Sequence, residues 1–400
     1  MSEQFFSPCP RGLEQALADE LAELGAGDVV AGDAGVAFRG DVTLCYRINL
    51  LSRIASRVLW QVEKAAYQTE EDVYETALAL PWQDWFDVNR TIAVAVNARK
   101  CPLRSLDFVT LRIKDAVCDC FRAKTGERPS VDTREPDVRI FAFLDETMAT
   151  FYVDTSGEAL FKRGRRAATT EAPLKENLAA GILRLTGWQP GVPLFDPMCG
   201  GGTFLIEAAQ MALDRAPGLD RRFGFDKLRS FQASAWEKVR HEAEAKRQAS
   251  RPLPLFGSDL YGDALKLARA NAAALGLGEV IEFKQVNVRE VNPPAVSGIW
   301  ITNPPYGVRI GEQEELAKLY PDLGHVLKQR FAGWTAYFFT ADLRLAKLIR
   351  LQASKRTPLF NGPLECRLFE YRMVAGGARK TKNAARSPDS PCEDKSRRAA

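Results

Sequence analysis

The sequence predicts an α/β protein, with a Rossmann-like domain in its second half and an α+β region before it. Three observations support this prediction. A glycine-rich turn at residues 200–202 follows an apolar stretch, Asp259 closes a second apolar stretch, and the tetrapeptide Asn303-Pro304-Pro305-Tyr306 follows another. In a doubly wound sheet, ligands bind beyond the carboxyl ends of the strands, so we expect these groups to line one site.

The glycine-rich turn connects an apolar strand to a helix-forming segment, residues 204–209. Glycine permits positive φ and lets a ligand approach the backbone, and the following helix offers unpaired N–H groups to an anionic carboxylate. The spacing fits neither a dinucleotide fingerprint nor a Walker A loop. Because tight turns also use glycine for steric reasons, the turn alone is moderate support for a nucleotide-type cradle.

Two further strands end in polar residues. Residues 254–258 run into Asp259 and then into a predicted helix at 263–275, while the strand at 280–286 ends at Asn287. An acidic residue in the position of Asp259 grips ribose hydroxyls in doubly wound folds. It is equally suited to capping the following helix, and both interpretations stay open.

The tetrapeptide at residues 303–306 combines an amide, a stiff turn and an aromatic ring directly after the apolar run 298–302. The amide and backbone carbonyls can accept the two N–H bonds of a planar amino group while the ring stacks on it. The nitrogen lone pair is then free to act as a nucleophile without a general base. Asn-Pro is also an ordinary turn sequence, so the hypothesis depends on the other strand ends.

Together these residues resemble the S-adenosylmethionine-dependent RNA methyltransferases that carry a THUMP domain, in particular the 23S rRNA guanine-N2 methyltransferases. The resemblance extends to about residue 374. The matching motifs include D-P-M-C-G-G-G-T at 196–203, L-I-E-A-A at 205–209, G-S-D at 257–259, N-P-P-Y-G at 303–307, A-P-L-K-E-N-L-A-A at 172–180 and G-E-R-P-S-V-D at 126–132.

The resemblance implies a class I methyltransferase fold, S-adenosylmethionine as the cofactor and methyl transfer to the exocyclic N2 amine of a guanine in 23S rRNA, free or in a large-subunit assembly intermediate. Asp259 would hold the ribose, Asn287 would face the adenine, and Asn303 would contact both cofactor and base. The implied catalytic residues are Asn303, Pro304, Pro305 and Tyr306. The other implied cofactor contacts are Asp196, Pro197, Met198, Cys199, Gly200, Gly201, Gly202 and Thr203.

The chain departs from the family pattern at two of these positions. Members usually have Ser where Gly201 stands, which we expect to be tolerated because the turn acts through its backbone. They usually have Asp where Asn287 stands. An amide oxygen still accepts a hydrogen bond, but without the charge we expect weaker cofactor binding.

Three other functions remain as alternatives: a tRNA guanine-N2 methyltransferase, a DNA adenine-N6 methyltransferase, and a non-catalytic RNA-binding assembly factor. The DNA enzymes share the glycine and N-P-P-Y motifs, so the RNA assignment depends on the region before residue 176. A methylation assay on rRNA and duplex DNA separates these two classes.

The basic residues indicate where RNA would bind. The net charge is +4, yet residues 1–374 carry 48 acidic and 48 basic side chains, so any RNA site must come from local clusters. One cluster lies in the helix-patterned segment 99–128 and the other at 161–166, where phosphate contacts would give salt-dependent affinity. Charge runs are also often simply solvated faces. The candidate RNA contacts are Arg104, Arg112, Lys114, Lys162, Arg163, Arg165, Arg166 and Lys175.

The domain organisation follows from these patterns. Strand-like stretches at 91–96, 138–144 and 148–153 surround a helix with apolar residues recurring from 106 to 121, which is the β-α-β-β order of a THUMP domain, although an ordinary α+β domain has the same pattern. The expected parts are a ferredoxin-like piece at 1–44, THUMP at 45–155, a basic linker at 156–175, the methyltransferase domain at 176–374 with a polar insert at 215–251, and a disordered tail at 375–400.

Composition excludes several classes of protein. The eight cysteines are scattered and the two histidines lie in polar helical segments, so we expect reduced thiols, no metal site and no histidine-based catalysis. We find no apolar window of about 18 residues and no signal-peptide pattern. We therefore expect a cytoplasmic protein without a membrane partner.

Overall fold

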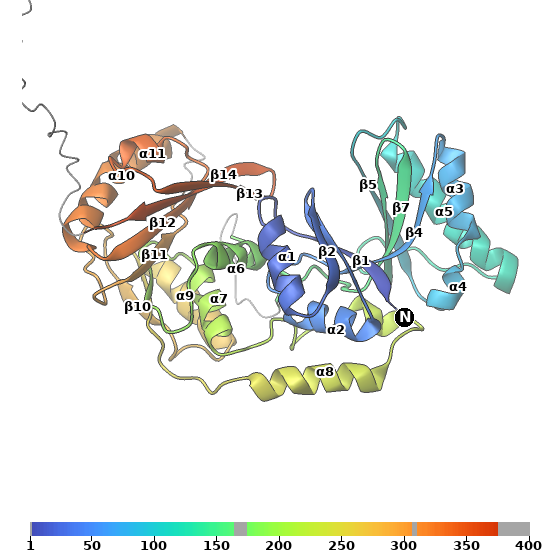
Figure 1. The fold of residues 1–400 in the computed structure, drawn as a ribbon, viewed down its shortest axis with the longest axis horizontal. Coiled ribbons are helices and arrows are strands. Elements are labelled where there is room, and N and C mark those ends of the chain that lie inside the picture. Colours follow the sequence, from blue (N-terminus) through green and yellow to red (C-terminus); the bar gives the residue numbers. More distant parts are fainter. Residues whose placement is uncertain (1, 164–173, 306–309, 375–400) are drawn as a thin grey trace, which may run out of the picture.

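The computed structural model describes residues 2–163, 174–305 and 310–374, with two seven-stranded sheets. Tyr306, Arg165, Arg166 and the tail at 375–400 lie outside the described residues, so predictions about them remain untested. The first sheet occupies the N-terminal half of the chain and the second the C-terminal half (Figure 1).

The N-terminal sheet is continuous across the ferredoxin-like and THUMP-like regions. Its strand order is β2-β3-β1-β4-β7-β6-β5, and β4 joins the two regions because it pairs with both β1 and β7. The strands are β1 (Glu3–Pro8), β2 (Gly27–Gly32), β3 (Gly35–Gly40), β4 (Leu59–Ala66), β5 (Ile92–Ala98), β6 (Val138–Leu144) and β7 (Met148–Asp154).

The helices of this half pack on one face of the sheet. Leu17 of α1 and Val109 of α5 are both fully buried in the core that also holds Phe5 and Ile140. Ser105 caps α5 by accepting the N–H of Phe108, and Gly126 ends it in the left-handed conformation. The helices are α1 (Glu14–Glu23), α2 (Val42–Leu51), α3 (Glu70–Ala79), α4 (Trp82–Trp85) and α5 (Leu106–Thr125).

The order β5-α5-β6-β7 confirms the β-α-β-β arrangement expected from the sequence. The expected boundary between residues 44 and 45 instead falls inside helix α2, where Leu44, Cys45 and Tyr46 are all buried. Helix α2 is therefore continuous across that position, and these side chains pack into the shared core.

The C-terminal sheet has the expected Rossmann-like arrangement. Its order is β10-β9-β8-β11-β12-β14-β13; β8 to β12 run parallel, and β14 is antiparallel to β12 and β13. The strands are β8 (Leu194–Asp196), β9 (Leu255–Asp259), β10 (Glu282–Gln285), β11 (Gly298–Thr302), β12 (Trp334–Thr340), β13 (Lys355–Asn361) and β14 (Leu364–Arg372).

Both faces of this sheet are covered, as alternate residues of β11 demonstrate. Ile299 and Ile301 join the core that extends into the N-terminal half, whereas Trp300 joins a second core with Leu323 and Leu327 of α10. The helices are α6 (Glu176–Leu185), α7 (Thr203–Ala212), η1 (Gly224–Lys227), α8 (Ala233–Lys246), α9 (Gly262–Ala274), α10 (Ile310–Arg330) and α11 (Leu345–Leu348).

The insert at residues 215–251 connects the two halves rather than standing free in solvent. Tyr46 of α2 packs on Phe225 with ring centroids 4.5 Å apart, and its hydroxyl accepts the N–H of Gln232. Trp236 of α8 packs edge-on to Tyr46. Helix α8 runs along one side of the molecule beside α2 (Figure 1).

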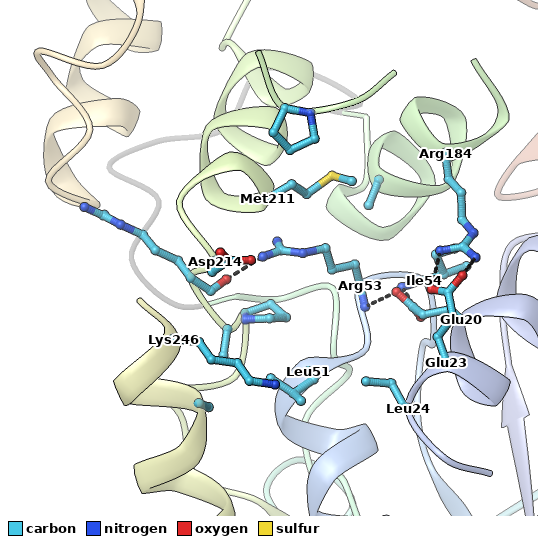
Figure 2. A pocket seen from close by; sticks show the side chains of 16 residues that line it. Glu20, Glu23, Leu24, Leu51, Arg53, Ile54, Arg184, Met211, Asp214 and Lys246 are labelled. Atoms are coloured by element: carbon cyan, nitrogen blue, oxygen red, sulfur yellow. Dashed lines mark hydrogen bonds and ion pairs between the residues drawn. The ribbon is translucent and has the colours of Figure 1, made fainter. Parts of the chain in front are cut away.

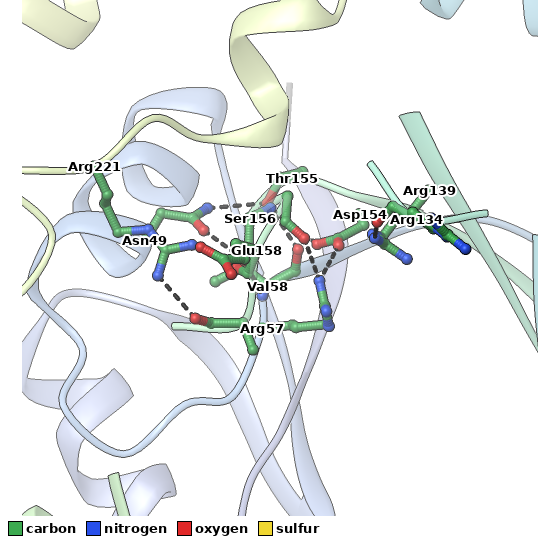
Figure 3. Close-up of polar contacts among 12 residues, drawn as sticks. Asn49, Arg57, Val58, Arg134, Arg139, Asp154, Thr155, Ser156, Glu158 and Arg221 are labelled. Atoms are coloured by element: carbon green, nitrogen blue, oxygen red, sulfur yellow. Dashed lines mark hydrogen bonds and ion pairs between the residues drawn. The ribbon is translucent and has the colours of Figure 1, made fainter. Parts of the chain in front are cut away.

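The segment that leaves β7 is also fixed by hydrogen bonds. The Arg57 guanidinium binds the Asp154 carboxylate and the Gly157 carbonyl, and Arg221 donates to the carbonyls of Glu158 and Ala159 (Figure 3). The start of the predicted basic linker is therefore held against the N-terminal half and the insert.

Three further observations apply to the described part of the chain. Its seven cysteines are free thiols. It contains no helix that is long and apolar enough to cross a membrane. It also contains no cluster of three or more His, Cys, Asp or Glu side chains able to hold a metal ion.

Candidate active site

The glycine turn and the N-P-P turn leave the same edge of the C-terminal sheet. Strands β8 and β11 are parallel neighbours, with Ile299 opposite Leu194 and Trp300 opposite Phe195. The turns after Asp196 and Thr302 are consequently adjacent. This is also where the strand order reverses direction, which is the usual ligand position in doubly wound sheets.

The backbone of the glycine turn requires glycine at two positions. Gly200 has φ 51° and Gly202 has φ 80°, in the left-handed region that residues with a Cβ avoid. Gly202 is the N-cap of α7 and has no side chain that could accept from the first N–H groups of the helix. The first turn also contains no acidic residue, so no carboxylate of that turn lies at the start of the helix. Its N–H groups are therefore suited to an external carboxylate.

Asp259 holds the glycine turn from the neighbouring strand. Its Oδ2 accepts the backbone N–H of Gly200 at 2.9 Å, and its Oδ1 accepts that of Tyr261 at 3.0 Å. The residue is buried at the end of β9. The N-cap of α9 is Tyr261, and the helix has no side-chain cap, so the capping interpretation of Asp259 is wrong. Since each carboxylate oxygen of Asp259 has a second lone pair, it has capacity for two hydroxyl donors.

Asp196 lies at the end of β8 and is buried, with its Oδ1 accepting the N–H of Met198 at 3.2 Å. Burial raises the pKa of its carboxyl to about 8; the Met198 amide opposes this shift, and the charge of Asp259 adds to it. A cation placed beside Asp196 would stabilise the charged form.

The N-P-P turn follows β11 directly. Asn303 is half-buried, Pro304 is buried and Pro305 is exposed. Asn303 makes at least one contact within the protein. The structure thus brings Asn303 and Pro304 to the sheet edge beside the glycine turn, while Tyr306 lies outside the described residues.

Asn287 is half-buried beyond β10, where its Oδ1 accepts the backbone N–H of Arg289 at 3.0 Å. Its backbone carbonyl accepts the N–H of Glu290 at 2.8 Å, closing a turn. The side chain retains its amide donors and a lone pair. Its expected contact with an adenine remains a prediction.

Two buried residues near the site were missed from sequence. Asn271 of α9 donates its Nδ2 to the Gly201 carbonyl at 3.2 Å, and Glu207 of α7 forms ion pairs with Arg163 and Arg53. Both are at most 4% exposed. Each is a single polar residue within an apolar helical segment, Glu207 in L-I-E-A-A and Asn271 in A-N-A-A. That pattern could have identified both as buried polar residues.

Arg163 differs most from its predicted role. Its guanidinium is 5% exposed, and it binds the Glu207 carboxylate and the Arg53 carbonyl. It is therefore unavailable as a surface contact for phosphate. Lys162 is exposed beside Glu158, and Lys175 lies 4.9 Å from the centroid of the Phe161 ring, so these two remain candidates.

The predicted cations of the THUMP-like helix are partly engaged within the protein. The Arg112 guanidinium lies 3.9 Å from the centroid of the Tyr74 ring and pairs with Glu71, while Lys114 pairs with Asp115 at 2.6 Å. Arg104 is exposed just before the helix. Surface ion pairs of this kind are weak, so they leave the RNA prediction open.

A separate cavity of about 380 Å³ lies between the N-terminal piece and α6, α7 and α8 (Figure 2). Arg53 extends along it, donating from its backbone to Glu20 and from its guanidinium to the carbonyl of Arg215. The predicted site residues do not line this cavity. It marks the junction of the two halves, away from the glycine turn.

Comparison with known families agrees with this geometry. The model described as RMKL-like, methyltransferase domain matches residues 163–370, the THUMP domain model matches residues 67–154, and the RlmL ferredoxin-like domain model matches residues 4–59. The chain belongs to the RMKL-like methyltransferase family. The family match includes both turns of the site, and the ferredoxin-like match extends fifteen residues beyond the boundary expected at 44.

Known RMKL-like relatives match most of this chain. The protein named ribosomal RNA large subunit methyltransferase K/L from Shewanella sp. (strain W3-18-1) is 40% identical over 94% of this chain and 54% of its own length. The protein named putative RNA methyltransferase slr0064 from Synechocystis sp. is 39% identical over 92% of this chain and 96% of its own length. The chain therefore spans about half the length of the Shewanella relative.

A solved structure shares the whole fold. SMU.472, described as a putative methyltransferase complexed with SAH, is 29% identical, and the match covers 94% of this chain and 99% of that chain with a TM-score of 0.85. The arrangement of both sheets in one molecule is thus shared with the solved structure of SMU.472.

Proposed function

We propose that this protein transfers a methyl group from S-adenosylmethionine to the exocyclic N2 amine of a guanine in 23S rRNA. The observation that carries the proposal is the adjacency of the glycine turn after β8 and the N-P-P turn after β11. Membership of the RMKL-like family and the name of the Shewanella relative support rRNA as the substrate class.

The residues of the site fit this cofactor. The uncapped start of α7 suits the methionine carboxylate, buried Asp196 suits a cationic group, and Asp259 retains lone pairs for the ribose hydroxyls. The SAH complex of SMU.472 is consistent with the same cofactor class. When bound, S-adenosylmethionine supplies an electrophilic methyl group on a sulfonium sulfur.

Asn303 and Pro304 would orient the target amine. The Asn303 Oδ1 and the Pro304 carbonyl accept the two N–H bonds, which directs the nitrogen lone pair toward the methyl donor. Guanine N2 is a weak nucleophile because its lone pair is delocalised into the ring, so orientation and electrostatics contribute most of the rate gain. Entry requires the base to leave its stack, with Tyr306 as a new stacking partner.

The proposal is tested by methylation of a substrate panel with the purified full chain. Tritiated S-adenosylmethionine is offered with 23S rRNA, 16S rRNA, bulk tRNA and duplex DNA, and the labelled product is digested to nucleosides for mass spectrometry. We expect N2-methylguanosine from 23S rRNA. Label in tRNA or as N6-methyladenine in DNA would assign one of the other two enzymatic functions, and absence of cofactor binding would indicate a non-catalytic protein.

A further inference from the structure

The N-terminal sheet has a second face, opposite helices α1, α2, α3 and α5. Phe5, Val153 and Ile140 point to the helices, and the register of the strands places their neighbours on the other side. Phe6 and Tyr152 are two such neighbours, and their ring centroids lie 6.1 Å apart.

Aromatic rings gather on this second face. Tyr152 pairs with Phe141 across β7 and β6, and Phe143 follows Phe141 on the same side of β6. Tyr152 is only 8% exposed, whereas Phe143 is 38% exposed. We call Phe6, Phe141, Phe143 and Tyr152 the aromatic face. Its exposure increases from Tyr152, which is buried, to Phe143, which is exposed to solvent.

Cations surround the aromatic face. Lys64 lies across from Thr150, the residue opposite Phe143, and Arg39 lies opposite Gln4 beside Phe6. Both Lys64 and Arg39 are exposed. The strand register therefore places two exposed positive charges beside the rings.

The acidic residue at the end of this face is neutralised within the protein. The carboxylate of Asp154 is fully buried and pairs with Arg57, whose guanidinium lies 5.5 Å from the centroid of the Phe141 ring. Arg139 lies on the same side and donates to the Arg134 carbonyl at 2.9 Å (Figure 3). Asp154 therefore does not oppose an anionic ligand on the aromatic face.

The two edges of the sheet also approach each other. Asp33, in the turn between β2 and β3, pairs with Arg99, which follows β5 at the opposite edge. The sheet is therefore curved, and the aromatic face is its concave side. The curvature explains why Tyr152 is shielded at the centre while Phe143 remains accessible.

We propose that the aromatic face binds unpaired bases of single-stranded RNA, with Phe143 as the principal accessible stacking ring and Lys64 and Arg39 as phosphate contacts. Open sheet faces with aromatic rings stack bases, and stacking requires bases that are not paired in a duplex. The inference rests on the proposed function, because it takes the RNA substrate as the occupant and adds a surface that holds it outside the methyl-transfer site.

Positive charge favours RNA over an apolar protein segment as the occupant, because Lys64, Arg39 and Arg139 border the rings while Asp154, at the end of the face, is buried and paired. Phosphate contacts supply affinity for any RNA, and ring stacking adds affinity only for unpaired bases. Loss of a phosphate contact should therefore weaken the binding of single-stranded and duplex RNA alike, whereas loss of a stacking ring should weaken only the binding of single-stranded RNA.

The test compares Phe143→Ala with two controls in the full chain. Affinity is measured by fluorescence anisotropy for a labelled, unstructured oligoribonucleotide of about 12 nucleotides and for its duplex. We expect Phe143→Ala to weaken single-stranded binding by at least about fivefold and to leave duplex binding unchanged. Phe143→Tyr keeps a ring and should restore affinity. Phe108→Ala removes a more exposed ring from α5 and should have no effect.

Lys64→Ala provides a separate readout, since it should weaken single-stranded and duplex RNA alike and lower the salt dependence of both. The proposal is overturned if Phe143→Ala and Phe108→Ala bind RNA equally well, or if Phe143→Ala weakens the duplex as much as the single strand. Methylation of 23S rRNA by the unaltered chain together with either result would retain the proposed function and reject only the aromatic face.

Discussion

Asn271 of α9 donates its side-chain amide to the carbonyl of Gly201, 3.2 Å away, and so ties a helix that follows β9 to the turn that follows β8. Asp259 holds the same turn through the N–H of Gly200. The conformation of the glycine turn therefore depends on two side chains that lie 59 and 70 residues later in the sequence.

Replacing Asn271 with Ala should loosen this turn. We expect the affinity for S-adenosylhomocysteine to fall about fivefold, in line with the ~1 kcal/mol of a typical hydrogen bond, because the Gly201 carbonyl loses its donor. Isothermal titration calorimetry measures the change, with the exposed Asn97→Ala as a control. Equal affinities of the two variants would show that Asn271 does not position the turn.

Substitution of Gly201 and of Gly202 by a residue with a side chain should change the free energy of unfolding by different amounts. Gly202 has φ 80°, and an added Cβ would lie 3.3 Å from that of Ala268, so Gly202→Ala should cost roughly 1–2 kcal/mol in unfolding free energy. Gly201 has no positive φ, and its nearest contact would be an ordinary 3.5 Å to Asn271, so Gly201→Ser should be tolerated. Urea unfolding of both variants makes the comparison; equal losses would contradict it.

Asn303→Ala should separate binding from chemistry. If its amide oxygen orients the target amine, kcat for methylation should fall by at least about 100-fold, the range seen when one oriented polar group is removed from a site, while cofactor affinity stays near that of the unaltered chain. The exposed Asn292, which lies outside the predicted site, offers Asn292→Ala as a matched control. Normal turnover at saturating cofactor would remove Asn303 from the catalytic role.

The buried pair of Arg163 and Glu207 should contribute to stability rather than to RNA affinity. Glu207→Gln leaves the buried guanidiniums of Arg163 and Arg53 without a charged partner, and we expect a loss of about 3–5 kcal/mol. The double variant Arg163→Met with Glu207→Leu should lose less than the single variant. A salt-dependent loss of RNA affinity in Arg163→Met, with unchanged stability, would return Arg163 to the RNA surface.

Asp196 should give the ligand-free protein a distinctive pH dependence. Burial raises the pKa of its folded-state carboxyl to about 8, above the ordinary value of 3.8, so between these values the folded state holds a proton that the unfolded state has released. This contribution is full below pH 4 and is lost as pH rises through 8, at up to about 1.4 kcal/mol per pH unit. Relative to Asp196→Asn, the unaltered protein should lose stability from pH 5 to 9. If the difference in stability between the unaltered protein and Asp196→Asn does not change with pH, the pKa of Asp196 is not raised in the folded state.

Local sequence was sufficient for the parts of the site that belong to single segments. The apolar run 298–302 followed by Asn303-Pro304 can only end a strand in a stiff turn, because proline lacks an N–H and fixes φ. The left-handed backbone of Gly200 and Gly202 is likewise the reason for glycine at those positions. Residue spacing alone predicted that both turns follow strands.

Contacts between distant segments were decided by the tertiary structure. The basic run at 161–166 predicts an exposed cation at Arg163, yet the fold places it against Glu207, and the polar insert carries the aromatic residues that pack on Tyr46. Side-chain burial depends on which surface a segment meets, and no local pattern contains that information. The sequence by itself determined the strands, the turns and the chemistry they carry; only packing decided which charges are buried, which helices hold the glycine turn and which aromatic rings remain on the open face.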